Sequence, residues 1–369
     1  MSDENFSFFR KLYEEYKGFG KEQLKENYKH WIGNVKLPEK KVEEIFLNFR
    51  LKTFFTFLDI LRTLYFSRSV FEVIKKYNED IWFGFEILSF LLNKNLIKLR
   101  KDKVIFREKF DSFFIKPLSE KEIITKLQRG LRMKIDLSKP LLYNLNRNSK
   151  FKWKANYDQI PITTKSAVSL LSKISYYFPA KLNFAFLGDD DFLSIPFKII
   201  FNVPTFSLDK DKDLLSEIEE ICKKRNIDIV TLEADVLKPK KIGSFYGCYT
   251  NPPYNLPGST QFVRFASKLM GKEGGIIFLV LGNDAIGKRF VHLQREIANL
   301  NLVIKEVLPS TISYGFYPYH KEDKLIYKKM KRLGVNIRGK EVSFAALYVL
   351  EYVGKVKKTL REKSIYSYV

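Results

Sequence analysis

The stretch Leu182-Asn183-Phe184-Ala185-Phe186-Leu187-Gly188-Asp189-Asp190-Asp191 joins a short apolar run to a glycine and three consecutive carboxylates. The apolar run is typical of a strand that is buried on both faces of a parallel sheet. Gly188 permits a tight turn directly after the strand, and open α/β sheets bind ligands at the carboxyl ends of their strands. The stretch therefore predicts the first strand of a nucleotide-binding sheet that ends in an acidic site.

The chain after residue 156 alternates apolar strands with helical stretches, which is the pattern of a doubly wound α/β domain. We expect strands at 182–187, 203–208, 228–232, 245–250, 275–281, 302–307 and 345–352. The predicted catalytic domain accordingly extends over residues 156–369.

Polar residues follow the next three strands as well. Asp209 ends the second strand, where a carboxylate accepts hydrogen bonds from ribose hydroxyls in nucleoside-binding sheets. Asp235 ends the third, within reach of an adenine amino group. Asn251-Pro252-Pro253-Tyr254 ends the fourth and joins a side-chain amide to two stiff prolines and an aromatic ring. Four such strand ends in register predict a Rossmann-like, adenosylmethionine-dependent transferase domain.

The N-terminal part reads as a mostly helical domain over residues 1–115. Amphipathic helical sequence up to about residue 50 precedes expected helices at 54–66, 70–77 and 83–92 and an expected strand pair at 96–99 and 104–106. Three helices followed by a hairpin with a basic tip is the order of a winged helix. Residues 116–155, with Pro117, Pro140 and a polar stretch at 144–148, are expected to connect the two domains.

Composition restricts the class of protein. The 369 residues are 45% hydrophobic and 29% charged, as in globular proteins, and they contain no apolar run long enough to cross a bilayer. The N-terminus lacks the pattern of a signal peptide, so a cytoplasmic protein is expected. Two cysteines and three histidines without ligand spacing predict no metal site. The net charge of +23 favours a polyanionic partner, although the basic residues are spread along the chain.

Three motifs together resemble the branched-chain polyamine synthase family: Tyr157-Asp158-Gln159, then Thr163-Thr164, then the Gly-Asp-Asp-Asp run within 187–194. The resemblance implies a transfer of aminopropyl groups from decarboxylated S-adenosylmethionine to the internal amine of spermidine, with 5'-methylthioadenosine as product. It also implies a winged-helix-like N-terminal domain, a homodimer and no metal.

The same resemblance implies roles for individual residues. The acidic run holds the polyamine, and one of Asp189, Asp190 and Asp191 removes the proton from the attacking nitrogen. The donor is bound by Gly188, Asp209, Asp235, Asn251 and Pro252, and the acceptor by Tyr157, Asp158, Gln159 and Tyr254. One departure is that Asn251 stands where the family commonly has aspartate.

Two other classes of function fit part of the sequence. Asn251-Pro252-Pro253-Tyr254 is also the motif of methyltransferases that act on amino groups in nucleic acids, and the basic charge suits such a substrate. A non-catalytic DNA-binding regulator would use the expected winged helix. Against the methyltransferase, three adjacent carboxylates beside the pocket would repel phosphate, so an amine is the favoured substrate. A DNA-binding regulator leaves the acidic strand ends unexplained.

Overall fold

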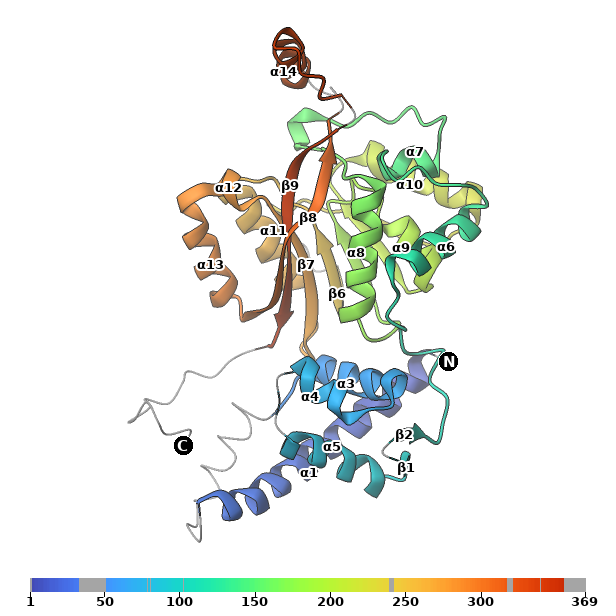
Figure 1. Cartoon of the computed structure of the whole chain (residues 1–369), viewed down its shortest axis with the longest axis vertical. Coiled ribbons are helices and arrows are strands. Elements are labelled where there is room, and N and C mark those ends of the chain that lie inside the picture. Colours follow the sequence, from blue (N-terminus) through green and yellow to red (C-terminus); the bar gives the residue numbers. More distant parts are fainter. Residues whose placement is uncertain are drawn as a thin grey trace. The chain divides into compact units, whose positions relative to one another are not determined.

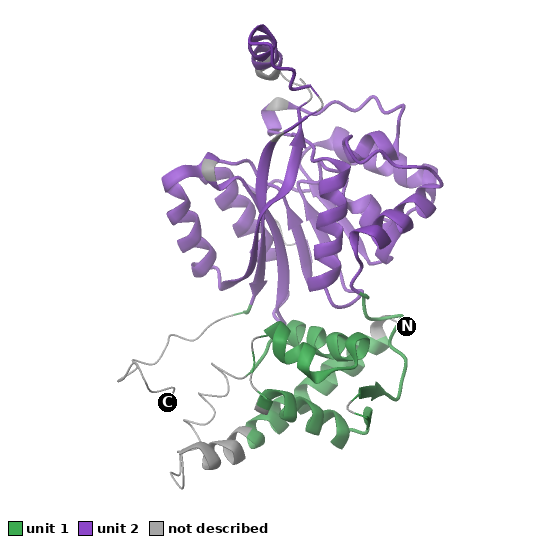
Figure 2. Ribbon diagram, viewed as in Figure 1, with its two compact units in different colours: residues 1–116, 353–369 green, residues 117–352 purple. Residues whose placement is uncertain are grey.

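The computed structural model describes residues 2–32, 51–77, 79, 81–101, 103–238, 242–316, 321–338 and 340–354. The chain divides into two compact units (Figure 2): unit 1 comprises residues 1–116 with 353–369, and unit 2 comprises Pro117–Tyr352. None of the helices in these described ranges is both long and apolar enough to span a membrane.

Unit 1 is helical with one hairpin. Its elements are α1 (Ser2–Ile32), α3 (Phe54–Ser67), α4 (Val70–Tyr77), α5 (Ile81–Asn93), β1 (Ile97–Arg100) and β2 (Lys103–Phe106). The two strands are antiparallel, with Ile97 opposite Phe106. The predicted order of three helices and a hairpin is confirmed; residues 33–50 of the expected N-terminal helical segment lie outside the described residues.

Unit 2 is built on a seven-stranded sheet in the order β5-β4-β3-β6-β7-β9-β8. The strands are β3 (Phe184–Leu187), β4 (Thr205–Asp209), β5 (Val230–Glu233), β6 (Gly247–Thr250), β7 (Gly275–Leu281), β8 (Leu302–Gly315) and β9 (Glu341–Tyr352). Strands β3 to β7 are parallel, whereas β9 is antiparallel to both β7 and β8. The predicted Rossmann-like α/β class is thereby confirmed.

Helices cover both faces of this sheet (Figure 1). Helices α8 (Thr164–Tyr177), α9 (Ser194–Phe201) and α10 (Lys212–Arg225) lie on one side, and α11 (Leu256–Leu269), α12 (Asn283–Ile286) and α13 (Phe290–Asn299) on the other. Alternate residues of a strand point to opposite faces. In β3, Phe184 contacts Phe197 of α9, while Ala185 and Leu187 belong to the core that includes α11 and α13. At β3, both faces of the sheet are therefore apolar and covered.

Two regions differ from expectation. The segment 116–155 contains α6 (Glu120–Leu131) and α7 (Leu141–Leu145), and from Pro117 onward it belongs to unit 2, where α6 packs against α8 and α9. A capping box of Ser119 and Glu122 begins α6. Strand β8 continues past the predicted end at residue 307 to Gly315, because a bulge between Leu308 and Ile312 accommodates Pro309 at the sheet edge.

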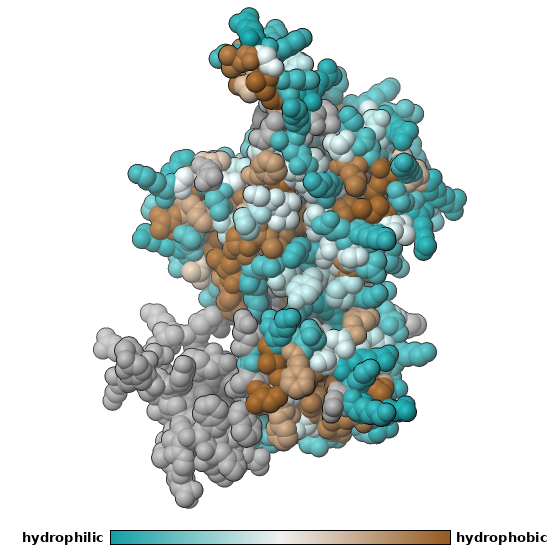
Figure 3. All heavy atoms as spheres, in the orientation of Figure 1, coloured by the Kyte–Doolittle hydropathy of each residue, from teal (hydrophilic) through white to brown (hydrophobic). Residues whose placement is uncertain are grey.

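The insertion between β8 and β9 holds helix α14 (Lys321–Arg332), and the 3-10 helices η2 (Ala155–Tyr157) and η3 (Gly287–Arg289) also belong to unit 2. Part of the face of unit 2 seen in Figure 3 is apolar, and β8 exposes Val303, Ile304 and Val307. Single exposed apolar residues of this kind are normal on a protein surface.

Candidate active site

The register of the parallel strands brings the predicted site residues to one edge of the sheet. Leu187 of β3 lies opposite Leu208 of β4 and Thr250 of β6. The residues that follow these three, Gly188, Asp209 and Asn251, are consequently neighbours, and all three line a cavity of about 540 Å³. This cavity is larger than a second one that Asp190 also lines, and it forms the centre of the candidate site.

Gly188 makes the turn that opens the site. Its φ is +74°, a conformation that glycine adopts without steric cost, and its N–H donates to the carbonyl oxygen of Leu208 at 2.9 Å. A Cβ at this position would lie 3.1 Å from the ring of Phe262 in α11. The missing side chain therefore keeps the floor of the larger cavity open.

The three aspartates of the acidic run point in different directions. Asp189 is fully buried and turns inward, where it accepts from the N–H groups of Leu193 at 2.9 Å and Ser194 at 3.3 Å. The hydroxyl of Ser207 in β4 donates to its other oxygen at 3.0 Å. Burial, above all, raises the pKa of Asp189 to about 7. Asp189 lines neither of the cavities at the site, so its contacts bind α9 to β4.

Asp191 is held by three donors. It accepts from the Ile162 N–H at 2.8 Å, the Tyr249 hydroxyl at 2.7 Å and the Asn251 amide at 3.2 Å. Burial is the largest influence and raises its pKa, while these donors oppose the shift. Asp191 also lines neither cavity. Its role in this geometry is to orient the side chains around the pocket.

Asp190 is the member of the run that faces the cavities. Its side chain is 7% exposed, and apart from its own backbone amide no donor among the described residues is found for its carboxylate. Burial and the adjacent charges of Asp191 and Asp209 raise its pKa well above the usual value. A buried carboxylate without a partner is costly. The site is therefore arranged to receive a cation or a hydrogen-bond donor at Asp190.

A smaller cavity of about 280 Å³ meets the larger one at this point. The two share Asp158, Asp190, Asn251 and Asn255, and the smaller cavity continues along Ile160, Pro252, Tyr254, Tyr314 and Ser343. Ser343 and Tyr314 come from β9 and β8, so the antiparallel edge of the sheet forms one wall. Asp190 lies where the two cavities join.

Asn251 connects the acidic run to this wall. Its amide nitrogen donates to Asp191, and its oxygen accepts from the hydroxyls of Tyr254 and Tyr314, each at 3.1 Å. The two tyrosine hydroxyls also contact one another. Burial is the largest cause of the raised pKa of both tyrosines, so they remain neutral donors. All polar atoms of the Asn251 side chain are thereby engaged within the protein.

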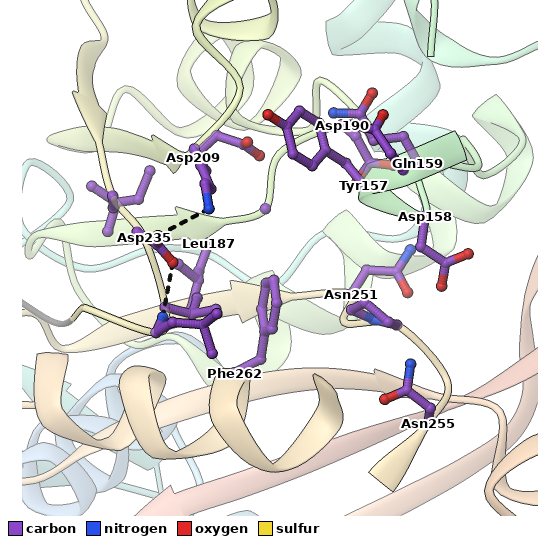
Figure 4. A pocket seen from close by; sticks show the side chains of 18 residues that line it. Tyr157, Asp158, Gln159, Leu187, Asp190, Asp209, Asp235, Asn251, Asn255 and Phe262 are labelled. Atoms are coloured by element: carbon purple, nitrogen blue, oxygen red, sulfur yellow. Dashed lines mark hydrogen bonds and ion pairs between the residues drawn. The ribbon is translucent and has the colours of Figure 1, made fainter. Parts of the chain in front are cut away.

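The far end of the larger cavity is lined by two carboxylates and by apolar side chains. Asp209 accepts from the Asp211 N–H at 2.7 Å, and burial raises its pKa to about 6. Asp235 accepts from the Leu237 N–H at 2.9 Å and pairs with Lys210 at 3.0 Å, and these contacts lower its pKa. Figure 4 shows the ring of Phe262 projecting into the space between Asp235 and Asn251. Leu187, Leu208 and Val236 complete an apolar lining.

The segment Tyr157-Asp158-Gln159 forms a further wall of the cavities. Tyr157 and Gln159 line the larger cavity, and Asp158 lines both. Gln159 is 4% exposed, and its amide donates to Asp211 at 3.0 Å. Of the residues predicted for the site, only Asp189 and Asp191 thus line neither cavity.

Sequence reasoning missed several residues that the structure places here. Tyr249 and Tyr314 bond to the acidic network, Phe262 lines the larger cavity, and Lys210 pairs with Asp235. Tyr249 had a usable signal, because it is a polar-tipped side chain in a strand two residues before Asn251. For Tyr314, the sequence indicates only that the segment 314–319 could close over the pocket. Its contact with Asn251 depends on the unexpected extension of β8.

Comparison with known proteins identifies the family. The family model "Branched-chain polyamine synthase A C-terminal domain" matches residues 145–365, which is more than half of the chain. No curated protein sequence matches this chain.

Two solved structures from Thermus thermophilus are similar to this chain. The branched-chain polyamine synthase C9 mutein, in complex with N4-aminopropylspermidine and 5'-methylthioadenosine, is 15% identical with a TM-score of 0.50, covering 88% of this chain and 95% of its own. The branched-chain polyamine synthase bound to the same two molecules is 14% identical with a TM-score of 0.48, covering 94% and 96%. On the match to the C-terminal domain model, the chain belongs to the branched-chain polyamine synthase A family.

Proposed function

We propose that this protein transfers aminopropyl groups from decarboxylated S-adenosylmethionine to the internal amine of spermidine. The observation that carries the proposal is the position of Asp190, a buried carboxylate without a described side-chain partner at the junction of two cavities. The larger cavity takes the nucleoside of the donor, and the smaller takes the acceptor. The two reacting groups then meet beside Asp190.

The larger cavity fits the donor's nucleoside. Asp209 stands at the end of the second parallel strand, where a carboxylate accepts from ribose hydroxyls. Asp235 lies further along with lone pairs left for the adenine amino group, and Phe262 and Val236 offer apolar contact to the base. The volume of about 540 Å³ lies within the range of small-molecule sites.

Charge favours the decarboxylated donor over S-adenosylmethionine itself. The carboxylate of S-adenosylmethionine would enter a region that already holds Asp190 and Asp191. Burial raises the pKa of both, and at Asp190 the neighbouring carboxylates raise it further, so another negative charge is disfavoured there. The decarboxylated donor carries only positive charges at that end, from its sulfonium and its ammonium group. It therefore relieves the excess of negative charge instead of increasing it.

The acceptor nitrogen is a secondary ammonium in water and must lose one proton before it can attack. Asp190 takes this proton, and its raised pKa brings it closer to that of the amine than an ordinary aspartate would be. The nitrogen lone pair then forms a bond to the propyl carbon while the carbon–sulfur bond breaks. Its electron pair stays on sulfur, which leaves as the neutral thioether of 5'-methylthioadenosine. The tertiary amine product keeps its remaining proton.

The site offers less support for methyl transfer to nucleic acid. In that reaction the amide oxygen at position 251 has to accept from the target amine. Here the Asn251 oxygen already accepts from two tyrosine hydroxyls, and the amide nitrogen donates to Asp191. A phosphate backbone would also approach the anionic junction at Asp190.

Product analysis tests the proposal. The purified protein is incubated with decarboxylated S-adenosylmethionine and spermidine, and in parallel with S-adenosylmethionine and RNA or DNA. We expect mass spectrometry to find spermidine enlarged by aminopropyl groups, together with 5'-methylthioadenosine, in the first mixture only. Methylated nucleic acid in the second mixture, with unchanged spermidine in the first, would refute the proposal.

A further inference from the structure

Hydrogen bonds between its own residues hold the loop formed by residues 154–159 in shape. The Lys154 N–H donates to the side-chain oxygen of Gln159 at 2.8 Å, and the Tyr157 N–H donates to the Lys154 carbonyl at 3.1 Å. Asp158, at the tip, has a φ of +55°, which is uncommon for a residue with a side chain. The 154–159 loop thus carries Tyr157 and Asp158 to the site in one defined conformation.

Asp211 fastens this loop to the catalytic sheet. One of its oxygens accepts from the Lys154 ammonium at 2.6 Å, and the other accepts from the Gln159 amide at 3.0 Å. Asp211 is 2% exposed and also caps α10 by accepting from the Asp213 N–H at 3.0 Å. Both ends of the loop therefore converge on one buried carboxylate, which lines neither cavity itself.

The same residue also touches the wall of the larger cavity. The Asp211 N–H donates to the carboxylate of Asp209 at 2.7 Å. Just before the loop, the indole N–H of Trp153 donates to the backbone oxygen of Asp190 at 3.0 Å. The loop is thereby connected to the backbone of Asp190 through Trp153 and to the carboxylate of Asp209 through Asp211, the two residues that the proposed reaction uses for the proton and for the donor.

We propose that Asp211 is a positioning residue that holds the 154–159 loop over the junction of the cavities. Tyr157 and Asp158 can then contact the acceptor while its internal nitrogen lies beside Asp190. The inference rests on the proposed function for its substrate, although the attachment of the loop can be tested without it. Asp211 acts through Lys154 and Gln159 and contacts neither donor nor acceptor.

The anchor is a set of charge-assisted hydrogen bonds, whose loss typically changes an equilibrium about ten- to a hundredfold. Asp211→Asn retains an oxygen that can cap α10 but removes the charge that pairs with Lys154. We expect the acceptor KM to rise by about tenfold or more, and kcat to change by less. Affinity for 5'-methylthioadenosine should stay within about threefold, because the backbone N–H that holds Asp209 is retained.

Two further variants make the test specific. Lys154→Met keeps the aliphatic stem and the cap of α10, so it reports on the loop even if Asp211→Asn folds poorly. Asp213→Asn is the matched control: Asp213 also bonds Lys154, at 2.6 Å, but its side chain is 75% exposed. An exposed ion pair contributes little, so this variant should remain close to the wild type.

The readouts are acceptor kinetics and hydrogen exchange of the peptide spanning 151–163. Faster exchange and a higher acceptor KM in Asp211→Asn and Lys154→Met, but not in Asp213→Asn, support the proposal. The double variant Asp211→Asn/Lys154→Met should then raise the acceptor KM no more than the stronger of the two single variants does, because both substitutions break the same Lys154–Asp211 contact. Unchanged exchange, or faster exchange with an unchanged acceptor KM, overturns it. A wild-type protein without aminopropyl transfer would refute the proposed function and leave the exchange result to stand alone.

Discussion

Replacing Asp190 by asparagine separates its charge from its shape. The substitution preserves size in a site where the side chain is 7% exposed, but it removes the proton acceptor at the junction of the cavities. Loss of a positioned general base typically lowers the rate by a factor of about 10² to 10⁴. We therefore expect kcat for aminopropyl transfer to fall at least about a hundredfold.

The pH dependence gives the substitution a second signature. Because the pKa of Asp190 is raised, kcat/KM in the wild type should decline on the acid side at a pH well above that of an ordinary aspartate. Asp190→Asn should lose this limb. It should also be more stable than the wild type at pH 8, where the wild type must keep an uncompensated charge buried.

The assay measures aminopropyl product against pH, with thermal unfolding recorded for each variant. Glu233→Gln is the control, because it removes an exposed carboxylate at the end of β5 that pairs with Lys212 and lines neither cavity. We expect it to keep its rate within about threefold, as surface changes usually do. An Asp190→Asn protein with nearly normal turnover and an unchanged acid limb would refute the assignment of the base.

Three further substitutions test the surroundings. Asp189 has a pKa of about 7 when folded, so its native state binds a proton that the unfolded chain releases near pH 4, and its contribution to stability falls as the pH rises between these values. Asp189→Asn should remove up to about 2.7 kcal/mol of that fall between pH 5 and pH 8, measured by denaturant unfolding at both values, and an unchanged difference would contradict this. Tyr249→Phe removes a donor at 2.7 Å to Asp191 and should lower kcat about tenfold, with intact circular dichroism; full activity would show that the orientation of Asp191 is unimportant. Gly188→Ala should destabilise the fold by about 1 kcal/mol and weaken calorimetric binding of 5'-methylthioadenosine, whereas undiminished binding would contradict the close approach inferred at this turn.

Strand positions and strand ends could be predicted because both depend on local sequence. Apolar runs bounded by polar residues marked every strand of the sheet, and residues that end parallel strands must share an edge. Asp209, Asp235 and Asn251 were therefore placed at one site without coordinates. The helix α6 had an equally local signal in Ser119 and Glu122, which form its capping box, but the surrounding prolines favoured a connecting segment.

The sequence could not predict which contacts each of the three aspartates in the acidic run makes. Asp189, Asp190 and Asp191 are identical in chemistry and adjacent in sequence, so only the backbone of the turn decides where each points. Gly188 and Phe192 both have positive φ, at +74° and +56°, and they rotate the three carboxylates toward different partners. Those partners come from distant segments, such as Ser207 and Tyr249, whose proximity is a property of the fold.

A structure of the protein with 5'-methylthioadenosine and spermidine tests the central claim most directly. The quantity to measure is the distance from the Asp190 carboxylate to the internal nitrogen of spermidine. We predict a hydrogen bond of about 3 Å, with the thioether sulfur in the larger cavity on the opposite side of that nitrogen. A polyamine bound elsewhere, with Asp190 facing neither its internal nitrogen nor the sulfur, would contradict the account.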